Sequence, residues 1–201
     1  MYPLLLCSIV SLTVIVERIV YWATLDLNRH NGLIEEILEH CRLGEWDAVR
    51  QKTSGTRNPI LRVLISGILH RDYNLSKAME SAAMDQMKSM KRFMGILDTI
   101  ITVAPLLGIF GTVTGIILSF EMLGASGIED PKAVTSGIAQ ALITTAAGLG
   151  IAILTVFPYN YFNSRVESAV ASIETYATRL EIVCNGQPDD SPAMDEGARA
   201  S

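Results

Sequence analysis

Three long stretches of this 201-residue chain contain no charged side chain: Met1–Val16, Thr99–Phe120 and Ala133–Ser164. A helix needs about 20 apolar residues to cross the hydrocarbon core of a bilayer, and the second and third stretches exceed that length. Apolar residues resume after Glu17 and Arg18, so a first span is expected over Tyr2–Trp22, with that charged pair near the interface. The chain is therefore predicted to cross a membrane three times.

The composition argues against several other classes of protein. Hydrophobic residues make up 49% of the chain and charged residues only 18%, less than the roughly one quarter typical of soluble domains. The net charge of −5 leaves no basic footprint for nucleic acid. No disulfide framework, metal site or cofactor is predicted from the three scattered cysteines, Cys7, Cys41 and Cys184. The three histidines have no acid or nucleophile at a fixed spacing, so no enzyme activity is predicted.

Basic residues at the ends of the spans predict the orientation. They follow the first span, precede the second and follow the third, whereas the short segment between the second and third spans holds only Lys132. By the positive-inside rule, the N-terminus is periplasmic and the C-terminus cytoplasmic. One group would lie at the anionic inner leaflet and contact lipid, although the topology rule alone also explains it: Lys88, Lys91 and Arg92.

The predicted fold is an all-α membrane protein with three transmembrane helices and long cytoplasmic helical extensions. The expected segments are transmembrane helices at 1–25, 96–121 and 132–162, a cytoplasmic helical region at 26–95, a periplasmic loop at 122–131, a cytoplasmic C-terminal helix at 163–184 and a disordered tail at 185–201. Within 26–95, one helix ends at Gly44 and a second is opened by Asn58 and Pro59. A third begins near Ser76 and is expected to continue into the second span without a break.

Small and polar residues form a stripe along each of the last two spans. In the second span they recur at steps of three and four residues: Pro105, Gly108, Thr112, Gly115 and Ser119. In the third span a similar spacing relates Gly137, Gln140, Thr144 and Gly148. Such a stripe admits either a second backbone or water, so helix packing and a lined conduit both remain open.

Gln140 is the most polar residue inside any span, and its amide needs hydrogen-bond partners or an internal cavity. Thr145 lies about 140° around the helix from Gln140, which puts it off the centre of the stripe and towards a neighbouring helix. Gly111 adds a GxxxG spacing with Gly115.

The segments TVAPLLGIFGTVTGI (102–116), GIAQALITTAAGLGIAI (137–153) and PLLLCSIVSLTVIVERIVYW (3–22) resemble the MotA/TolQ/ExbB proton-channel family, and its ExbB and TolQ branch in particular. The resemblance covers all three spans and their order. It implies a homo-oligomeric ring, typically a pentamer, in a bacterial inner membrane. The ring would surround a single-span partner of the ExbD or TolR type, use the proton-motive force, and act through a TonB-like or other protein that couples to the outer membrane.

The resemblance also assigns positions in the ion path. The family's threonine in the GTV motif falls on Thr112 and its third-span threonine on Thr145, while its glutamate in GIAEAL falls on Gln140. Glutamine does not titrate, so the proton carrier is expected to be an aspartate of the partner. Sodium as the coupling ion, a TolQ-like role in envelope maintenance, and a scaffold without ion conduction stay open. Close packing is expected at Gly111, Gly137 and Gly148, and bulky residues at Gly111 or Gly148 are expected to disrupt assembly.

Overall fold

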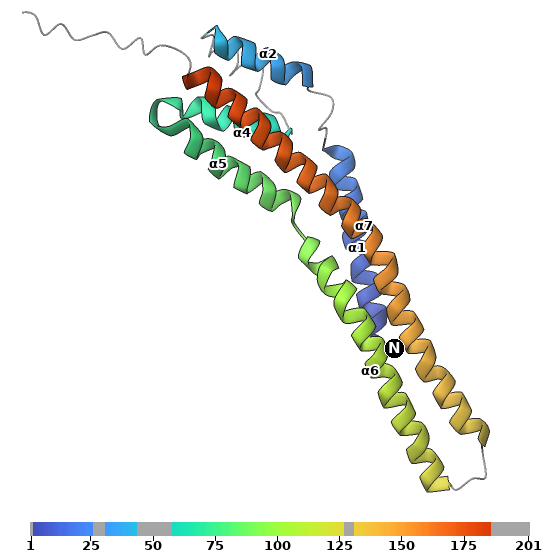
Figure 1. Cartoon of the computed structure of the whole chain (residues 1–201). Helices are drawn as coiled ribbons and strands as arrows, with labels where there is room; N and C mark the ends of the chain where they lie inside the picture. The colour runs from blue at the N-terminus through green and yellow to red at the C-terminus, as the bar shows by residue number, and fades with distance from the viewer. Residues whose placement is uncertain (1, 26–30, 44–57, 127–130, 186–201) are drawn as a thin grey trace, which may run out of the picture. The chain divides into compact units, whose positions relative to one another are not determined.

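A computed structural model describes residues 2–25, 31–43, 58–126 and 131–185 (Figure 1). These residues form six helices: α1 (Tyr2–Thr24), α2 (Asn31–Arg42), α4 (Pro59–Leu69), α5 (Arg71–Met90), α6 (Met94–Ser126) and α7 (Pro131–Asn185). The predicted helix end at Gly44, the middle of the predicted loop at 127–130 and most of the predicted tail lie outside the described residues.

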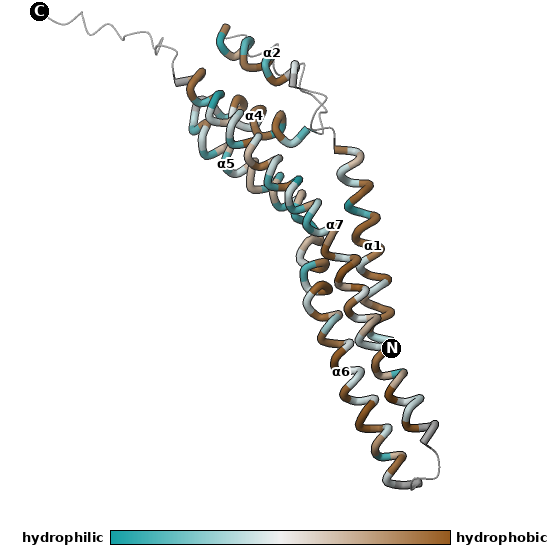
Figure 2. The backbone as a smooth tube through the Cα atoms, turned by 45° about the vertical axis from the view of Figure 1, so that its right-hand side comes forward, coloured by the Kyte–Doolittle hydropathy of each residue, from teal (hydrophilic) through white to brown (hydrophobic). Residues whose placement is uncertain are grey.

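Three of the helices, α1, α6 and α7, are long and apolar enough to cross a membrane, which confirms the three predicted spans. Figure 2 shows hydrophobic residues along α1, α6 and the first half of α7. With 33 and 55 residues, α6 and α7 measure roughly 50 and 80 Å at 1.5 Å per residue, more than the ~30 Å hydrocarbon core needs. Both helices begin before and end after the predicted membrane segments 96–121 and 132–162, whose limits stay predictions.

One compact unit, here called the membrane unit, comprises residues 1–26 and 85–170. Its three spans pack along one another, and each buries part of its apolar surface against the other two. Leu4 of α1 is buried against Ile100 and Ala104 of α6. Around them are partly buried residues from all three helices: Cys7, Val10, Leu107, Ala147 and Ile151.

The second compact unit comprises residues 27–84 and 171–201. Its helix α4 begins as predicted: the Asn58 side-chain oxygen accepts a hydrogen bond from the Ile60 amide at 2.9 Å, and Pro59 occupies the first turn. The apolar side chains of α4 form much of the described core: Ile60, Leu61, Val63, Leu64 and Ile68. Gly67 of α4 lies against Met79 of α5, which brings these two helices close together.

Two predictions about helix continuity are wrong. The chain does not run unbroken into the second span, because α5 ends at Met90 and α6 begins at Met94, with Phe93 at a positive φ of 63° between them. Conversely, residues 163–184 are not a separate helix, since α7 is continuous from Pro131 to Asn185. The start predicted near Ser76 matches a break inside α5, where the Asn74 side chain caps the Lys77 amide at 2.9 Å.

Candidate ion path along helices α6 and α7

Helices α6 and α7 approach each other through glycines. A Cβ atom at Gly108 would lie 3.0 Å from Thr145 Cα, and one at Gly148 would lie 2.5 Å from the Ala104 carbonyl oxygen. A Cβ at Gly111 would meet Thr144 Oγ1 at 2.5 Å, and one at Gly115 would meet the Ala141 side chain at 2.7 Å. At Gly148 a side chain would therefore force the backbones apart, and at Gly108 the neighbouring backbone would have to give by a few tenths of an ångström.

Three more members of the predicted stripes lie in this contact. Gly137 faces the Ser119 side chain, and the Ser119 hydroxyl donates to the Gly115 carbonyl at 2.8 Å. Thr144 is buried and donates to the Ala141 carbonyl at 2.6 Å. These hydroxyls are satisfied by backbone within the contact, as buried polar groups in a membrane must be. They belong to the packing between the two helices.

Thr112 and Thr145 form a different arrangement at the edge of the contact. Thr145 Oγ1 lies 2.8 Å from the Gly108 carbonyl oxygen and 3.2 Å from Thr112 Oγ1. Thr112 Oγ1 lies 2.6 Å from the Ile109 carbonyl oxygen. Both threonines are only partly buried, so this pair can be reached from outside the subunit.

The threonine pair can accept a further hydrogen bond. Each hydroxyl has a single hydrogen, and the shortest contacts assign one to the Gly108 carbonyl and the other to the Ile109 carbonyl. Whether the Thr145 hydroxyl donates to the Gly108 carbonyl at 2.8 Å or to Thr112 Oγ1 at 3.2 Å, each hydroxyl oxygen keeps at least one free lone pair. Water or a protonated carboxyl group could donate to them, whereas a carboxylate could not.

The threonine pair and α1 lie on opposite sides of the α6–α7 pair. At about 100° per residue, Thr112 is about 80° around α6 from the buried Ala104, while Ile100 and Leu107, which pack with α1, lie about 40° and 60° around in the other direction. The same holds on α7, where Thr145 lies to one side of Gly148 and Ile151 to the other. Pro105 lies on the threonine side of α6. The face that carries the hydroxyl pair is therefore not the face covered by the first span.

Gln140 does not join the threonines within one chain. It is exposed, and no hydrogen bond of its side chain to a described residue is found. It lies about 80° around α7 from Gly148, in the direction of the α1 side. The packed face is centred on Ala141, Thr144 and Gly148, so Gln140 lies beside it, and the place of Gln140 in the ion path stays a prediction. Thr145 is consequently closer to α6 than Gln140 is.

A second polar cluster, here called the Arg18 clamp, lies where α5 ends. Arg18 of α1 is only 1% exposed, and its guanidinium donates to the Met90 carbonyl at 3.2 Å and the Ser89 carbonyl at 3.4 Å. Two further contacts, at 2.5 and 2.7 Å, join it to the Glu17 carboxylate. Its charged group also lies 4.5 Å from the ring centre of Tyr21 and 5.8 Å from that of Phe93.

The clamp supplies hydrogen-bond donors to two carbonyls at the end of α5, where few backbone donors remain. The Ser89 carbonyl also accepts a long hydrogen bond of 3.4 Å from the Arg92 amide. The sequence indicated Glu17 and Arg18 as an interfacial pair but not their partner, because Ser89 and Met90 contribute only backbone atoms. Arg18 and Ser89 are 71 positions apart in the sequence, and no local pattern predicts their contact.

These features define a class of protein: a helical membrane protein whose last two spans are joined by glycines and carry hydroxyl groups on one side. The family model described as the MotA/TolQ/ExbB proton channel family matches residues 55–175, and the chain belongs to that family. No group of metal-binding side chains occurs among the residues that the structure describes.

Named relatives fall in the same family. The chain is 32% identical to the biopolymer transport protein ExbB-like 3 of Synechocystis, over 90% of this chain and 88% of that protein. It is 34% identical to the ExbB protein of Xanthomonas campestris over 56% of this chain and 44% of that protein. The TolQ protein of Pseudomonas aeruginosa is 34% identical over 54% of this chain and 47% of its own length. The chain is therefore a membrane protein of a proton-channel family, with similarity to both ExbB and TolQ.

Proposed function

We propose that this chain is the ring-forming subunit of an ExbB- or TolQ-type motor that couples proton flow to work at the outer membrane. The observation that carries the proposal is the Thr112–Thr145 pair, whose free lone pairs lie on the side of α6 and α7 that α1 leaves open. In a ring of copies, typically five in this family, that side would face the centre and α1 would face lipid. A single-span partner of the ExbD or TolR type would occupy the centre.

The partner must supply the proton carrier. Among the residues that the structure describes, the contact between α6 and α7 contains threonine, serine, alanine and glycine but no side chain that titrates near neutral pH. Acceptor oxygens favour the protonated form of a carboxyl group over its carboxylate. An intramembrane aspartate of the partner could then take a proton from one side of the membrane, pass the threonine pair in neutral form and release the proton on the other side.

The test is proton flux into vesicles that contain the chain together with its co-purifying single-span partner. We expect flux to depend on the partner and to fall to the background level when the partner's intramembrane aspartate is changed to asparagine. Flux that persists in the homomer alone would contradict the proposal. Absence of flux with intact complex, under both proton and sodium gradients, would favour a scaffold without ion conduction.

Thr112→Val is expected to lower partner-dependent flux about tenfold or more, since it removes one oxygen of the pair at nearly unchanged side-chain size. Gln140→Glu is expected to have a smaller effect, because Gln140 lies away from the pair. Thr114→Val is the matched control: Thr114 is on the same helix, and its hydroxyl contacts only the Phe110 and Gly111 carbonyls of that helix. Equal flux in the Thr112→Val and Thr114→Val variants would rule out the hydroxyl path.

A further inference from the structure

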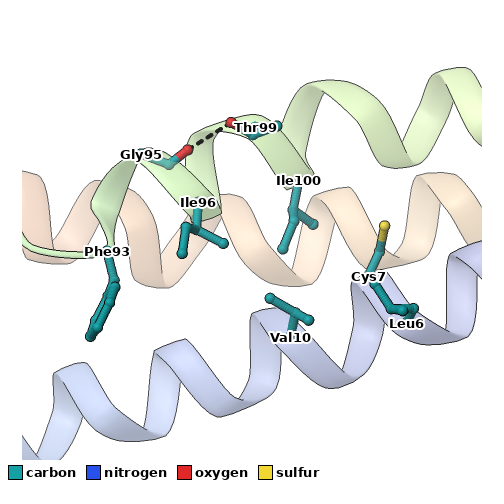
Figure 3. Close-up of a pocket in the computed structure, with 8 residues that line it drawn as sticks. All are labelled: Leu6, Cys7, Val10, Phe93, Gly95, Ile96, Thr99 and Ile100. Carbon is teal, nitrogen blue, oxygen red and sulfur yellow. Dashed lines mark hydrogen bonds between the residues drawn. The ribbon is translucent and has the colours of Figure 1, made fainter.

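A groove of about 490 Å³ opens between α1 and α6 on the surface of the membrane unit. Figure 3 shows the side chains of Val10, Ile96 and Ile100 pointing into the space between these helices, with Phe93 at one end and Leu6 at the other. The remaining lining residues are Cys7, Gly95 and Thr99. The Thr99 hydroxyl donates to the Gly95 carbonyl at 2.8 Å, so even this polar side chain is satisfied within its helix.

In the ring arrangement proposed above, on which this step rests, the groove faces lipid. Its lining residues on α6 are on the side towards α1, away from the threonine pair. Leu6 and Ile96 are 62% and 40% exposed in the subunit, so their apolar surface needs a cover. Because both walls belong to membrane-spanning helices, the surrounding medium is hydrocarbon, and an acyl chain fits an apolar groove of this kind.

The Phe93 end of the groove is strongly basic. The Arg92 guanidinium carbon lies 4.5 Å from the centre of the Phe93 ring, and Lys91 precedes it in the break between α5 and α6. Between Asp85 and Asp98 the sequence contains three charged residues, and all of them are basic: Lys88, Lys91 and Arg92. The Glu17 carboxylate is held by Arg18 through two contacts and also interacts electrostatically with Arg92, though less strongly than with Arg18.

We propose that this groove binds an anionic phospholipid, with its phosphate at Lys91 and Arg92 and one acyl chain against Val10, Ile96 and Ile100. The arrangement matches that of a phospholipid. The basic side chains lie at the end of the span, where a phosphate group would be, and the apolar lining of the groove follows from there along the helices, as an acyl chain would. Moving a chain from the bilayer into the groove brings no hydrophobic gain, so the basic side chains must supply the selectivity. The proposal is independent of ion conduction.

The contribution of the basic side chains is tested with the purified oligomer in nanodiscs that contain phosphatidylglycerol and phosphatidylcholine. The lipids that stay bound to the protein are counted by native mass spectrometry. We expect preferential retention of phosphatidylglycerol that falls about fivefold in Arg92→Gln and about 25-fold in the Lys91→Gln/Arg92→Gln variant. Arg165→Gln is the control, because Arg165 is also exposed and lies 5.5 Å from the ring of Tyr161, outside the groove. An equal loss in the control would mean non-specific attraction and would overturn the site.

The groove is tested separately with Gly95→Leu, which fills it from a position where an added Cβ meets nothing within 4 Å. Retention of both lipids should fall, while Gly124→Leu, at an equally open position on the same helix, should have no effect. If Gly95→Leu leaves lipid retention unchanged, the acyl chain does not occupy the groove. If it instead reduces the size of the oligomer, a second copy covers the groove, and either result overturns the proposal.

Discussion

The variant Gly148→Val is expected to separate α6 from α7 and to abolish assembly of a stable oligomer. A Cβ at this position would lie 2.5 Å from the Ala104 carbonyl oxygen and 3.1 Å from Gly108 Cα. Both are backbone atoms, so no side-chain rotation can make room and the helices must move apart. Overpacking typically lowers the free energy of unfolding by about 1–3 kcal/mol. Because the clash at Gly148 is with backbone atoms, we expect this variant to lose about 3 kcal/mol or more. The threonine pair would also lose its contact, because it bridges the same two helices.

The measurement is the oligomer size in detergent together with the midpoint of thermal unfolding. Gly150→Val provides the matched control, since it lies in the same helix and a Cβ there meets nothing within 4 Å. The helix propensity of the introduced valine is the same at both positions, so the difference between the variants reports packing alone. Gly111→Val should fall between them, because its obstacle is the Thr144 side chain, which can rotate. Equal behaviour at positions 148 and 150 would contradict the close approach.

The spans and the α6–α7 contact were predictable because they depend on composition and spacing. Uncharged stretches of sufficient length identify α6 and α7. Asn58 followed by Pro59 predicts the start of α4 from local sequence alone. The small residues of both stripes lie in one helix contact, because spacings of three and four residues return to one side of a helix. The glycines pack two helices of the same chain, however, so their effect on assembly would be transmitted through the fold of the subunit.

Other features could not be predicted because they depend on which neighbour a side chain finds. The spacing from Gly137 through Gln140 to Gly148 is nearly that of one face, yet a shift of the packed face towards Ala141 leaves Gln140 exposed and brings Thr145 to Thr112. The break between α5 and α6, residues 91–93, contains no glycine or proline, and the nearby Gly95 already lies inside α6. A non-glycine residue at positive φ costs about 1–2 kcal/mol, which contacts from distant parts of the chain must offset.

Those contacts are the subject of the second large prediction: Arg18→Met should destabilise the junction between α5 and α6 by about 2–4 kcal/mol. The substitution keeps an unbranched apolar stem but removes every donor. The buried Met90 carbonyl loses its side-chain donor, at roughly 1–3 kcal/mol for a buried group left unsatisfied. The Ser89 carbonyl keeps only its 3.4 Å hydrogen bond from the Arg92 amide. Glu17 recovers part of its hydration, because its side chain is 41% exposed. Phe93 also loses the charged group that lies near its ring.

Trypsin gives a local readout of this effect, since it cleaves after Lys91 and Arg92, inside the break itself. Arg18→Met is expected to raise the rate of cleavage there at least tenfold and to lower the thermal midpoint. Arg18→Lys should restore only part of the protection, because one ammonium group cannot reproduce the planar fork that reaches Glu17 and the α5 carbonyls together.

A surface pair in the second unit provides the control. Arg179 and Glu35 form an ion pair of 3.0 Å, but their side chains are 53% and 61% exposed. Arg179→Met should change the thermal midpoint far less, because water replaces the lost partner on both sides. The double variant Glu17→Gln/Arg18→Met should remain cleavable, since the loss of the donor to the Met90 carbonyl, rather than the unpaired carboxylate, carries most of the cost. If Arg18→Met left trypsin cleavage as slow as in the parent protein, the strained turn at Phe93 would have to be held by the packing of α5 and α6 alone.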